Sequence, residues 1–274
     1  VEECDKALAE MLPLQGIIAD YCGFRGEHLD ALRAQANAAV RASGAALLLL
    51  ENFKPWDADI IMRSVVESSL KFSHLLSSVE SFENRYIEYA EALPDIATLK
   101  NHIKAQDVNE MMEIAGSKPH QAFTDLILTD AEFETLNAKY PSKIRREIES
   151  KWSFSGLLAA IGKEPGPHAP LCKGLGHNYS MSSRILHADW HGVLMIMERE
   201  YRSEPSRTST YVAHSGRIIS DIFWFSVLRI SRGYKFTGKA SEPLNEVIKR
   251  HEPLLADINS FYKTWVDIEY PASE

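Results

Sequence analysis

Residues 177–191 bring together three histidines, an arginine, an aspartate, a tyrosine and three serines. If this segment is one continuous helix, a rotation of about 100° per residue places His177, Ser180, Arg184, His187 and His191 on one stripe. Imidazole exchanges protons near neutral pH, and a guanidinium stabilises negative charge. We therefore predict an acid–base site made of Arg184, His187 and His191. The simpler alternative is a surface helix whose three histidines have no chemical role.

Two further side chains of the same segment extend the predicted site. Tyr179, Ser183 and His187 follow one another at four-residue spacing along the boundary between the polar and apolar faces. A group at such a boundary is partly shielded from water and still reaches a ligand, so we predict that Tyr179 and Ser183 bind substrate. His187 and His191 also have the spacing of two zinc ligands, but no His-Glu-x-x-His motif is present and Asp189 points away from them. We expect no metal and no other cofactor.

A second polar stripe lies on the helix expected over residues 57–78 and contains Arg63, Glu67, Lys71 and His74. An arginine and a glutamate at i and i+4 commonly form a solvated pair worth a few tenths of a kcal/mol. Alternatively, Glu67 holds the Arg63 guanidinium flat so that it can clamp a phosphate or a carboxylate. We include Arg63 and Glu67 among the predicted substrate-binding residues.

A third polar group interrupts an otherwise apolar helix further along the chain, at His214, Arg217 and Asp221. Buried polar side chains must be paired. We therefore favour a satisfied core network over a functional site for these three residues.

The elements that must position these side chains are helices. Apolar residues recur at helical spacing and strand-like alternation is nearly absent, which predicts an all-α protein. We expect Asp57 to cap the third helix and Pro94 to kink the fourth. Residues 161–176, rich in proline and glycine, are expected to form an irregular loop or lid, and the whole of residues 1–274 one domain, a bundle of about eight to nine helices. The expected helices cover 2–21, 27–51, 57–78, 82–112, 130–139, 141–152, 177–201, 208–232 and 242–265.

The composition is that of an ordinary globular protein, with 45% apolar and 25% charged residues among 274. The net charge of −8 argues against general coating of nucleic acid or of anionic membranes, so any basic surface must be local. The longest apolar run, Ala45 to Leu50, is far shorter than a membrane span. The three cysteines, Cys4, Cys22 and Cys172, form no Cys-x-x-Cys pair, which favours a reducing cytoplasm.

Four short motifs follow one another along the chain: Arg63-Ser64-x-x-Glu67-Ser68, Arg85-Tyr86-x-x-Tyr89, Trp152-Ser153 leading to Gly162, and Tyr179-x-x-x-Ser183-x-x-x-His187. Their order resembles an uncharacterised bacterial all-helical family, known only as a domain of unknown function. Such proteins are similar to the HEPN (higher eukaryotes and prokaryotes nucleotide-binding) superfamily, which includes ribonucleases of toxin–antitoxin, CRISPR and phage-defence systems. Members carry an arginine followed after four to six residues by a histidine, and Arg184 to His191 and Arg207 to His214 have this spacing. The resemblance implies metal-independent RNA cleavage and a site formed across a dimer.

Three functions are compatible with these patterns. The first is an RNA-cleaving or nucleotide-directed effector of bacterial defence, acting as a homodimer, whose basic patch combines Lys173, Arg184, Arg199 and Arg202. The second is a non-catalytic binding, scaffold or sensor protein that acts through a partner protein. The third is a small-molecule or metal enzyme that uses the stripe from His177 to His191. The first requires Arg63 and His187 to face a shared cleft.

Overall fold

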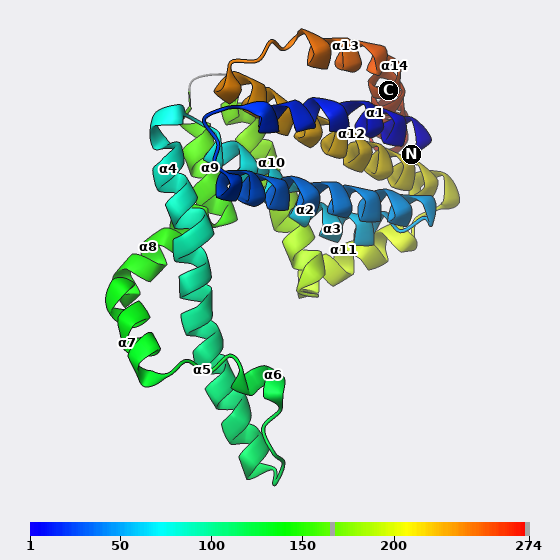
Figure 1. Cartoon of the computed structure of the whole chain (residues 1–274). Coiled ribbons are helices and arrows are strands. Elements are labelled where there is room, and N and C mark those ends of the chain that lie inside the picture. Colours follow the sequence, from blue (N-terminus) through cyan, green and yellow to red (C-terminus); the bar gives the residue numbers. More distant parts are fainter. Residues whose placement is uncertain (165–167, 272–274) are drawn as a thin grey trace. The chain divides into compact units, whose positions relative to one another are not determined.

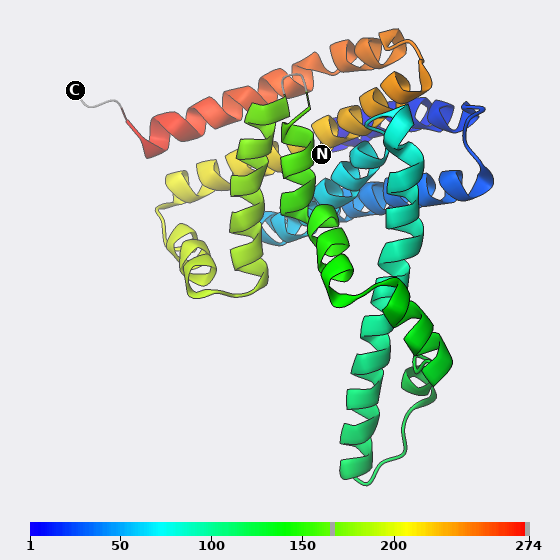
Figure 2. The same cartoon turned by 90° about the vertical axis from the view of Figure 1, so that its left-hand side faces the viewer.

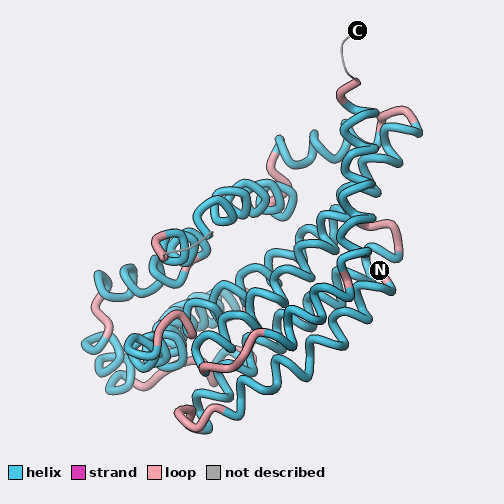
Figure 3. Tube along the Cα trace, turned by 90° about the horizontal axis from the view of Figure 1, so that it is seen from above, coloured by secondary structure: helices cyan, strands magenta, loops and turns pink. Residues whose placement is uncertain are grey.

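The computed structural model describes residues 1–164 and 168–271, with no account of the side chains of residues 168–173 and 178. Every regular element among these residues is helical, which confirms the all-α prediction (Figure 3). There are more helices than the eight or nine expected, because several expected helices are divided by turns. No described helix is both long enough and apolar enough to cross a bilayer.

Two compact units make up the chain, residues 1–79 with 158–274 and residues 80–157. We predicted that the whole chain forms one domain. Whether the two units fold together as one domain stays a prediction. The helices of the first unit are α1 (Glu2–Gly16), the 3-10 turn η1 (Ile17–Asp20), α2 (Gly26–Glu51), α3 (Pro55–Leu75), the end of α9 (Phe154–Gly162), α10 (His168–Leu186), α11 (Trp190–Glu200), α12 (Glu204–Thr237), α13 (Glu242–Arg250) and α14 (Glu252–Glu269).

The core of the first unit is built around α12, which contacts α1, α2, α3 and α14 (Figure 1). Its second half was expected to be a central buried helix, and Ile218, Ile222, Phe223 and Ile230 are fully buried. The helix ends at Gly238, whose positive φ of 68° is a left-handed conformation that glycine adopts without a steric penalty.

Helices α2 and α3 form a closely packed pair joined by a short turn. The buried positions of α2 recur every three or four residues, which is the pattern that predicted this helix. The expected start of α3 was wrong. Asp57 lies inside the helix, because Pro55 occupies its first turn, where the missing N–H of proline has no helical partner to lose.

The second unit is a smaller helical assembly. Helices α7 and α8 contact α5 and run beside it (Figure 2). Pro94, where a kink was expected, lies in the first turn of α5, and a π-helical segment, η2, precedes that helix. Its elements are α4 (Val79–Ile87), η2 (Glu88–Ala92), α5 (Leu93–Ile114), α6 (Gln121–Thr124), α7 (Asp130–Lys139), α8 (Ser142–Trp152) and the start of α9.

The segment expected to be a loop or lid is mostly helical. Helix α9 extends to Gly162 and α10 begins at His168, so residues 168–176 lie in a helix. The three residues 165–167 lie outside the described part of the chain, as do the side chains of Cys172 and Lys173. Of the other cysteines, Cys4 is buried and Cys22 is exposed, and both are free thiols.

Candidate functional site

Arg63, Glu67 and Tyr179 come together, as their predicted role requires. The Nη2 group of Arg63 on α3 donates a hydrogen bond to Tyr179 Oη on α10 at 2.6 Å, and Tyr179 Oη donates to Glu67 Oε1 at 2.6 Å. The guanidinium also lies over the Tyr179 ring, 4.3 Å from its centre. The pKa of Tyr179 is raised by burial and by the neighbouring Glu67 carboxylate. Glu67 therefore holds Arg63 through the tyrosine hydroxyl and not directly.

The space beside these three side chains is small. A cavity of about 20 Å³ is bordered by Arg63, Tyr179, Asp59 and Arg217, and one water needs about 10–15 Å³ of such space. The Nη1 atom of Arg63 is buried and has no hydrogen-bond partner among the described residues. The cavity has room for a water but not for a nucleotide, so this cluster positions α10 on α3 more readily than it binds a substrate.

Arg217 and Asp221 are paired on α12 as expected, together with a residue that the sequence patterns did not reveal, Asp59. The expected network is not fully satisfied, because His214 Nε2 is buried and has no hydrogen-bond partner in the described structure. Arg217 forms ion pairs with Asp59 and with Asp221, and His214 Nε2 lies 3.8 Å from Asp59 Oδ2. Asp59 is 5% exposed, so its carboxylate depends on these partners. Burial raises the pKa of Asp221, whereas the pKa of Arg217 is raised because its two carboxylate partners outweigh its own burial.

The His214 imidazole is stacked into the same region. Its ring centre lies 4.4 Å from that of Trp56, and the guanidinium of Arg199 lies over the same indole at 4.5 Å. Burial, together with the positive charges of Arg217 and Arg199, holds the pKa of His214 well below its ordinary value of 6.5. The imidazole is therefore neutral at physiological pH.

The basic patch predicted around Arg184 is not assembled as expected. Arg199 covers the Trp56 ring, and Arg202 is engaged in ion pairs with Glu198 and Glu269. Two of the four cations predicted for the patch are therefore already held by aromatic or acidic partners. Of the three whose side chains the structure describes, only Arg184 is left as an exposed arginine that could bind a ligand. The side chain of the fourth, Lys173, lies outside the described residues.

The predicted acid–base residues lie at a turn and not along one continuous helix. Helix α10 ends at Leu186, Ala188 takes a positive φ of 48°, and Asp189 caps α11 by accepting a hydrogen bond from the Gly192 N–H at 2.8 Å. The expected helix over 177–201 was therefore wrong at this point, and the single stripe through His187 and His191 does not exist.

Arg184, His187 and His191 are nevertheless neighbours in sequence at this turn, and all three side chains are exposed. Ser183 is half-buried one turn beyond Tyr179 on α10. Arg63 and Tyr179 are joined inside the helix packing, whereas His187 follows the end of α10 at the surface. No group of three or more His, Cys, Asp or Glu side chains suited to a metal lies together within residues 1–164 and 168–271.

Helices α10 and α11 pack closely where they meet, which keeps the turn between them tight. A Cβ atom on Gly192 would lie 2.5 Å from the carbonyl oxygen of Arg184, so only glycine permits this approach of α11 to the end of α10. The outer face of α11 is apolar and exposed, with Trp190 at 75% and Tyr201 at 83%.

Comparison with known proteins reveals no relative. No protein-family model matches the chain, and neither a curated protein nor a solved structure matches it significantly. The function must therefore be inferred from the residues of the chain itself.

Proposed function

We propose that this chain is a helical binding protein that acts through a protein partner docked on α11, and that this partner is a second copy of the chain. The observation that carries the proposal is a row of exposed apolar side chains on that helix. Trp190, Val193, Leu194, Met197 and Tyr201 are all at least 36% exposed.

The spacing of these side chains makes one continuous face. Positions separated by three, four and seven residues lie on the same side of a helix, and an apolar face of this kind is what helices bury against one another. Scattered single apolar side chains are normal on a protein surface, but a contiguous row is typical of an interaction site. Leu186, 47% exposed at the end of α10, adds to the apolar surface near this row.

A second copy is the partner that the sequence resemblance favours, because HEPN-type proteins usually form their sites across a dimer. A two-fold axis near the middle of α11 would set the same face against itself, as an isologous interface requires. Such pairing removes the exposed indole of Trp190 and the ring of Tyr201 from water.

The test is the molar mass of the purified chain, measured by light scattering over a range of concentrations. We expect the wild-type chain to dimerise and a Trp190→Ser/Tyr201→Ser variant to remain monomeric with the same helical circular dichroism. Ile114→Ser is the matched control, because Ile114 is 82% exposed at the end of α5, in the other compact unit. A wild-type chain that is monomeric at every concentration would contradict the proposal.

A second candidate function is metal-independent cleavage of RNA at the α10–α11 turn, in a bacterial defence or toxin–antitoxin system. The observation that favours it is the exposure of Arg184, His187 and His191 beside the apolar face of α11. One histidine would take the proton of the ribose 2′-hydroxyl as its oxygen attacks phosphorus, and another would protonate the departing 5′-oxygen. Arg184 would stabilise the charge on the phosphorane, and the products are a 2′,3′-cyclic phosphate and a 5′-hydroxyl.

This candidate is tested by incubating RNA with the protein in the presence of a chelator and analysing the ends of the fragments. Replacing His187 or His191 by alanine is expected to reduce the rate by about 10²- to 10⁴-fold, the usual contribution of general acid–base catalysis. His177→Ala is the control, since His177 is an exposed histidine of α10 away from the turn. RNA cleavage that both histidine variants retain would exclude this chemistry.

A further inference from the structure

Arg229 on α12 is a buried cation whose charge is not neutralised. Its side chain is 1% exposed, and no described carboxylate forms an ion pair with it. Arg217, twelve positions earlier on the same helix, has two carboxylate partners. Because burying an unpaired charge is costly, Arg229 is a position where an anion would be strongly favoured.

The hydrogen bonds of Arg229 leave donors unused. Nε donates to Gln15 Oε1 at 3.3 Å, Nη1 to Ser69 Oγ at 2.6 Å and Nη2 to Ser226 Oγ at 3.0 Å. A guanidinium has five N–H groups, so one N–H on each Nη atom remains without a partner among the described residues. All three acceptors are neutral. Carboxylate oxygens are acceptors that free guanidinium N–H groups bind strongly.

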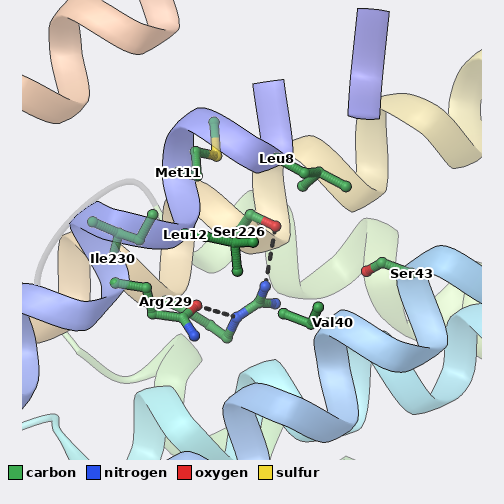
Figure 4. Close-up of a pocket in the computed structure, with 9 residues that line it drawn as sticks. Leu8, Met11, Leu12, Val40, Ser43, Ser226, Arg229 and Ile230 are labelled. Atoms are coloured by element: carbon green, nitrogen blue, oxygen red, sulfur yellow. Dashed lines mark hydrogen bonds between the residues drawn. The ribbon is translucent and has the colours of Figure 1, made fainter. Parts of the chain in front are cut away.

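These donors adjoin a cavity with a second unsatisfied polar group. The cavity has a volume of about 40 Å³ and lies between α1, α2 and α12, with Arg229 and Ser43 among its lining residues. Figure 4 shows the Ser43 hydroxyl pointing from α2 toward the side on which Arg229 lies. Ser43 is 2% exposed and its hydroxyl has no hydrogen-bond partner in the described structure. The cavity is thus bordered by a buried hydroxyl that has no partner and by a buried cation that keeps two unused N–H groups.

Apolar side chains form most of the other walls of this cavity, and a second, larger groove adjoins it along α1 and α2. Leu8, Met11 and Ile230 line the cavity (Figure 4). Leu12 and Gln15 also line a neighbouring groove of about 230 Å³ between α1 and α2, where Leu32, Ala36 and Phe72 supply apolar surface. A ligand that fits both parts therefore has an anionic head and a hydrocarbon tail.

We propose that Arg229 and Ser43 bind the carboxylate of a medium-chain fatty acid, whose hydrocarbon tail lies in the groove between α1 and α2. A carboxylate accepts from both free N–H groups of the guanidinium and from the Ser43 hydroxyl, and the tail covers the apolar side chains that face the groove. Burial lowers the pKa of Arg229 to about 10, so the guanidinium stays protonated at neutral pH. The proposal is independent of the surface on α11.

The direct test is calorimetric titration of the full chain with octanoate, with octan-1-ol as the uncharged ligand of equal chain length. We expect octanoate to bind at one site, at least about tenfold more tightly than octan-1-ol, because hydrogen bonds to charged groups are the strongest of their kind. Octanoate that does not bind, or that binds no better than the alcohol, would overturn the proposal.

Arg229→Met tests the residue itself and is expected to fold. Methionine occupies a similar length, and the two serine hydroxyls remain bonded to carbonyl oxygens of their own helices, Ser69 to Val65 at 2.6 Å and Ser226 to Ile222 at 3.0 Å. The variant should lose at least about tenfold in octanoate affinity while binding of octan-1-ol is unchanged. Ser43→Ala should lose about three- to tenfold.

Two further variants leave Arg229 in place and test where the hydrocarbon tail and the carboxylate lie. Leu12→Trp is expected to obstruct the shared wall and weaken octanoate binding, whereas Leu48→Trp, at an exposed position of α2, serves as the matched control. Arg33 also lines the groove, with 61% of its side chain exposed. If Arg33→Gln abolishes binding and Arg229→Met does not, the carboxylate lies at the wrong end and the proposal fails.

Discussion

Arg63 and Tyr179 are 116 positions apart in the sequence, yet their side chains are joined by a hydrogen bond of 2.6 Å and by stacking of the guanidinium on the phenol ring. This contact ties α10 to α3 and passes on to Glu67 through the same hydroxyl. The helix that leads to the exposed turn at His187 is therefore held at its middle by a polar relay, and the relay is expected to stabilise the fold.

Tyr179→Phe tests this relay. The change removes the acceptor of Arg63 and the donor to Glu67, both half-buried, and we expect it to lower the free energy of unfolding by about 1–3 kcal/mol. Urea unfolding with an unchanged slope measures the effect. Tyr262→Phe is the control, because Tyr262 is 57% exposed, and it should change stability by less than about 0.5 kcal/mol. Equal effects of the two variants would show that the relay adds nothing.

Arg217→Met is expected to be far more damaging. It leaves the carboxylates of Asp59 and Asp221 without their cation, and breaking a buried ion pair in this way costs about 3–5 kcal/mol. The loss should be smaller in mildly acidic buffer, because protonation of Asp221, whose pKa is raised by burial, removes one of the stranded charges.

The matched control for Arg217→Met is Arg250→Gln. Arg250 also pairs with a carboxylate, Glu10, but 56% of its side chain is exposed, so the predicted cost is below about 1 kcal/mol. Chemical denaturation of both variants at two pH values makes the comparison. A loss from Arg217→Met no larger than that from Arg250→Gln would mean that water reaches the network freely.

The helices themselves could be predicted because burial imposes a local period. The expected helix over 27–51 corresponds to α2, and the apolar second half of α12 is buried as its composition indicated. The turn at Ala188 could not be predicted from proline or glycine, since neither occurs between His187 and Asp189. The sequence indicates this turn only weakly, through Asp189, which caps α11, and through Gly192. The need for a glycine at position 192 depends on the nearby Arg184 carbonyl, which belongs to the tertiary structure.

For the site residues too, the sequence indicated single side chains but not the contacts between them. The polar stripes indicated Arg63, Glu67 and Tyr179 separately, but their pairing depends on how α10 meets α3, and no local pattern contains that information. Arg229 lies in an apolar run that the sequence identifies only as core. What makes this arginine unusual is the absence of a described carboxylate partner, which is a property of the tertiary structure.

His214 should make stability depend on pH. Its pKa is lowered in the folded state by burial and by Arg217 and Arg199, so below its ordinary value of 6.5 the unfolded chain binds a proton that the folded chain does not. Its contribution is therefore lost as the pH falls below 6.5, by up to about 1.4 kcal/mol per pH unit. Asp59, which faces the ring from α3, moderates the effect.

The measurement is the difference in unfolding free energy between wild type and His214→Gln, followed from neutral to mildly acidic pH. The variant should lose less stability on acidification than the wild type, and His177→Gln, at an exposed position of α10, should follow the wild type. Parallel curves for wild type and His214→Gln would contradict a lowered pKa.

Gly192→Ala should disturb the α10–α11 turn specifically. The added Cβ would lie 2.5 Å from the Arg184 carbonyl oxygen and 2.8 Å from the Ile185 nitrogen, both backbone atoms that cannot rotate away. We expect the two helices to separate at a cost of about 1–3 kcal/mol, the usual range for overpacking. Gly44→Ala is the matched change in the middle of α2, where nothing lies within 4 Å of the new Cβ, and it should raise stability by about 0.5–1 kcal/mol. Because the separation moves Leu186 at the end of α10 relative to the apolar face of α11, Gly192→Ala should also weaken dimerisation, whereas Gly44→Ala should not. Equal stability changes in the two alanine variants would show that α11 is free to shift and that the turn does not fix the surface proposed to bind the partner.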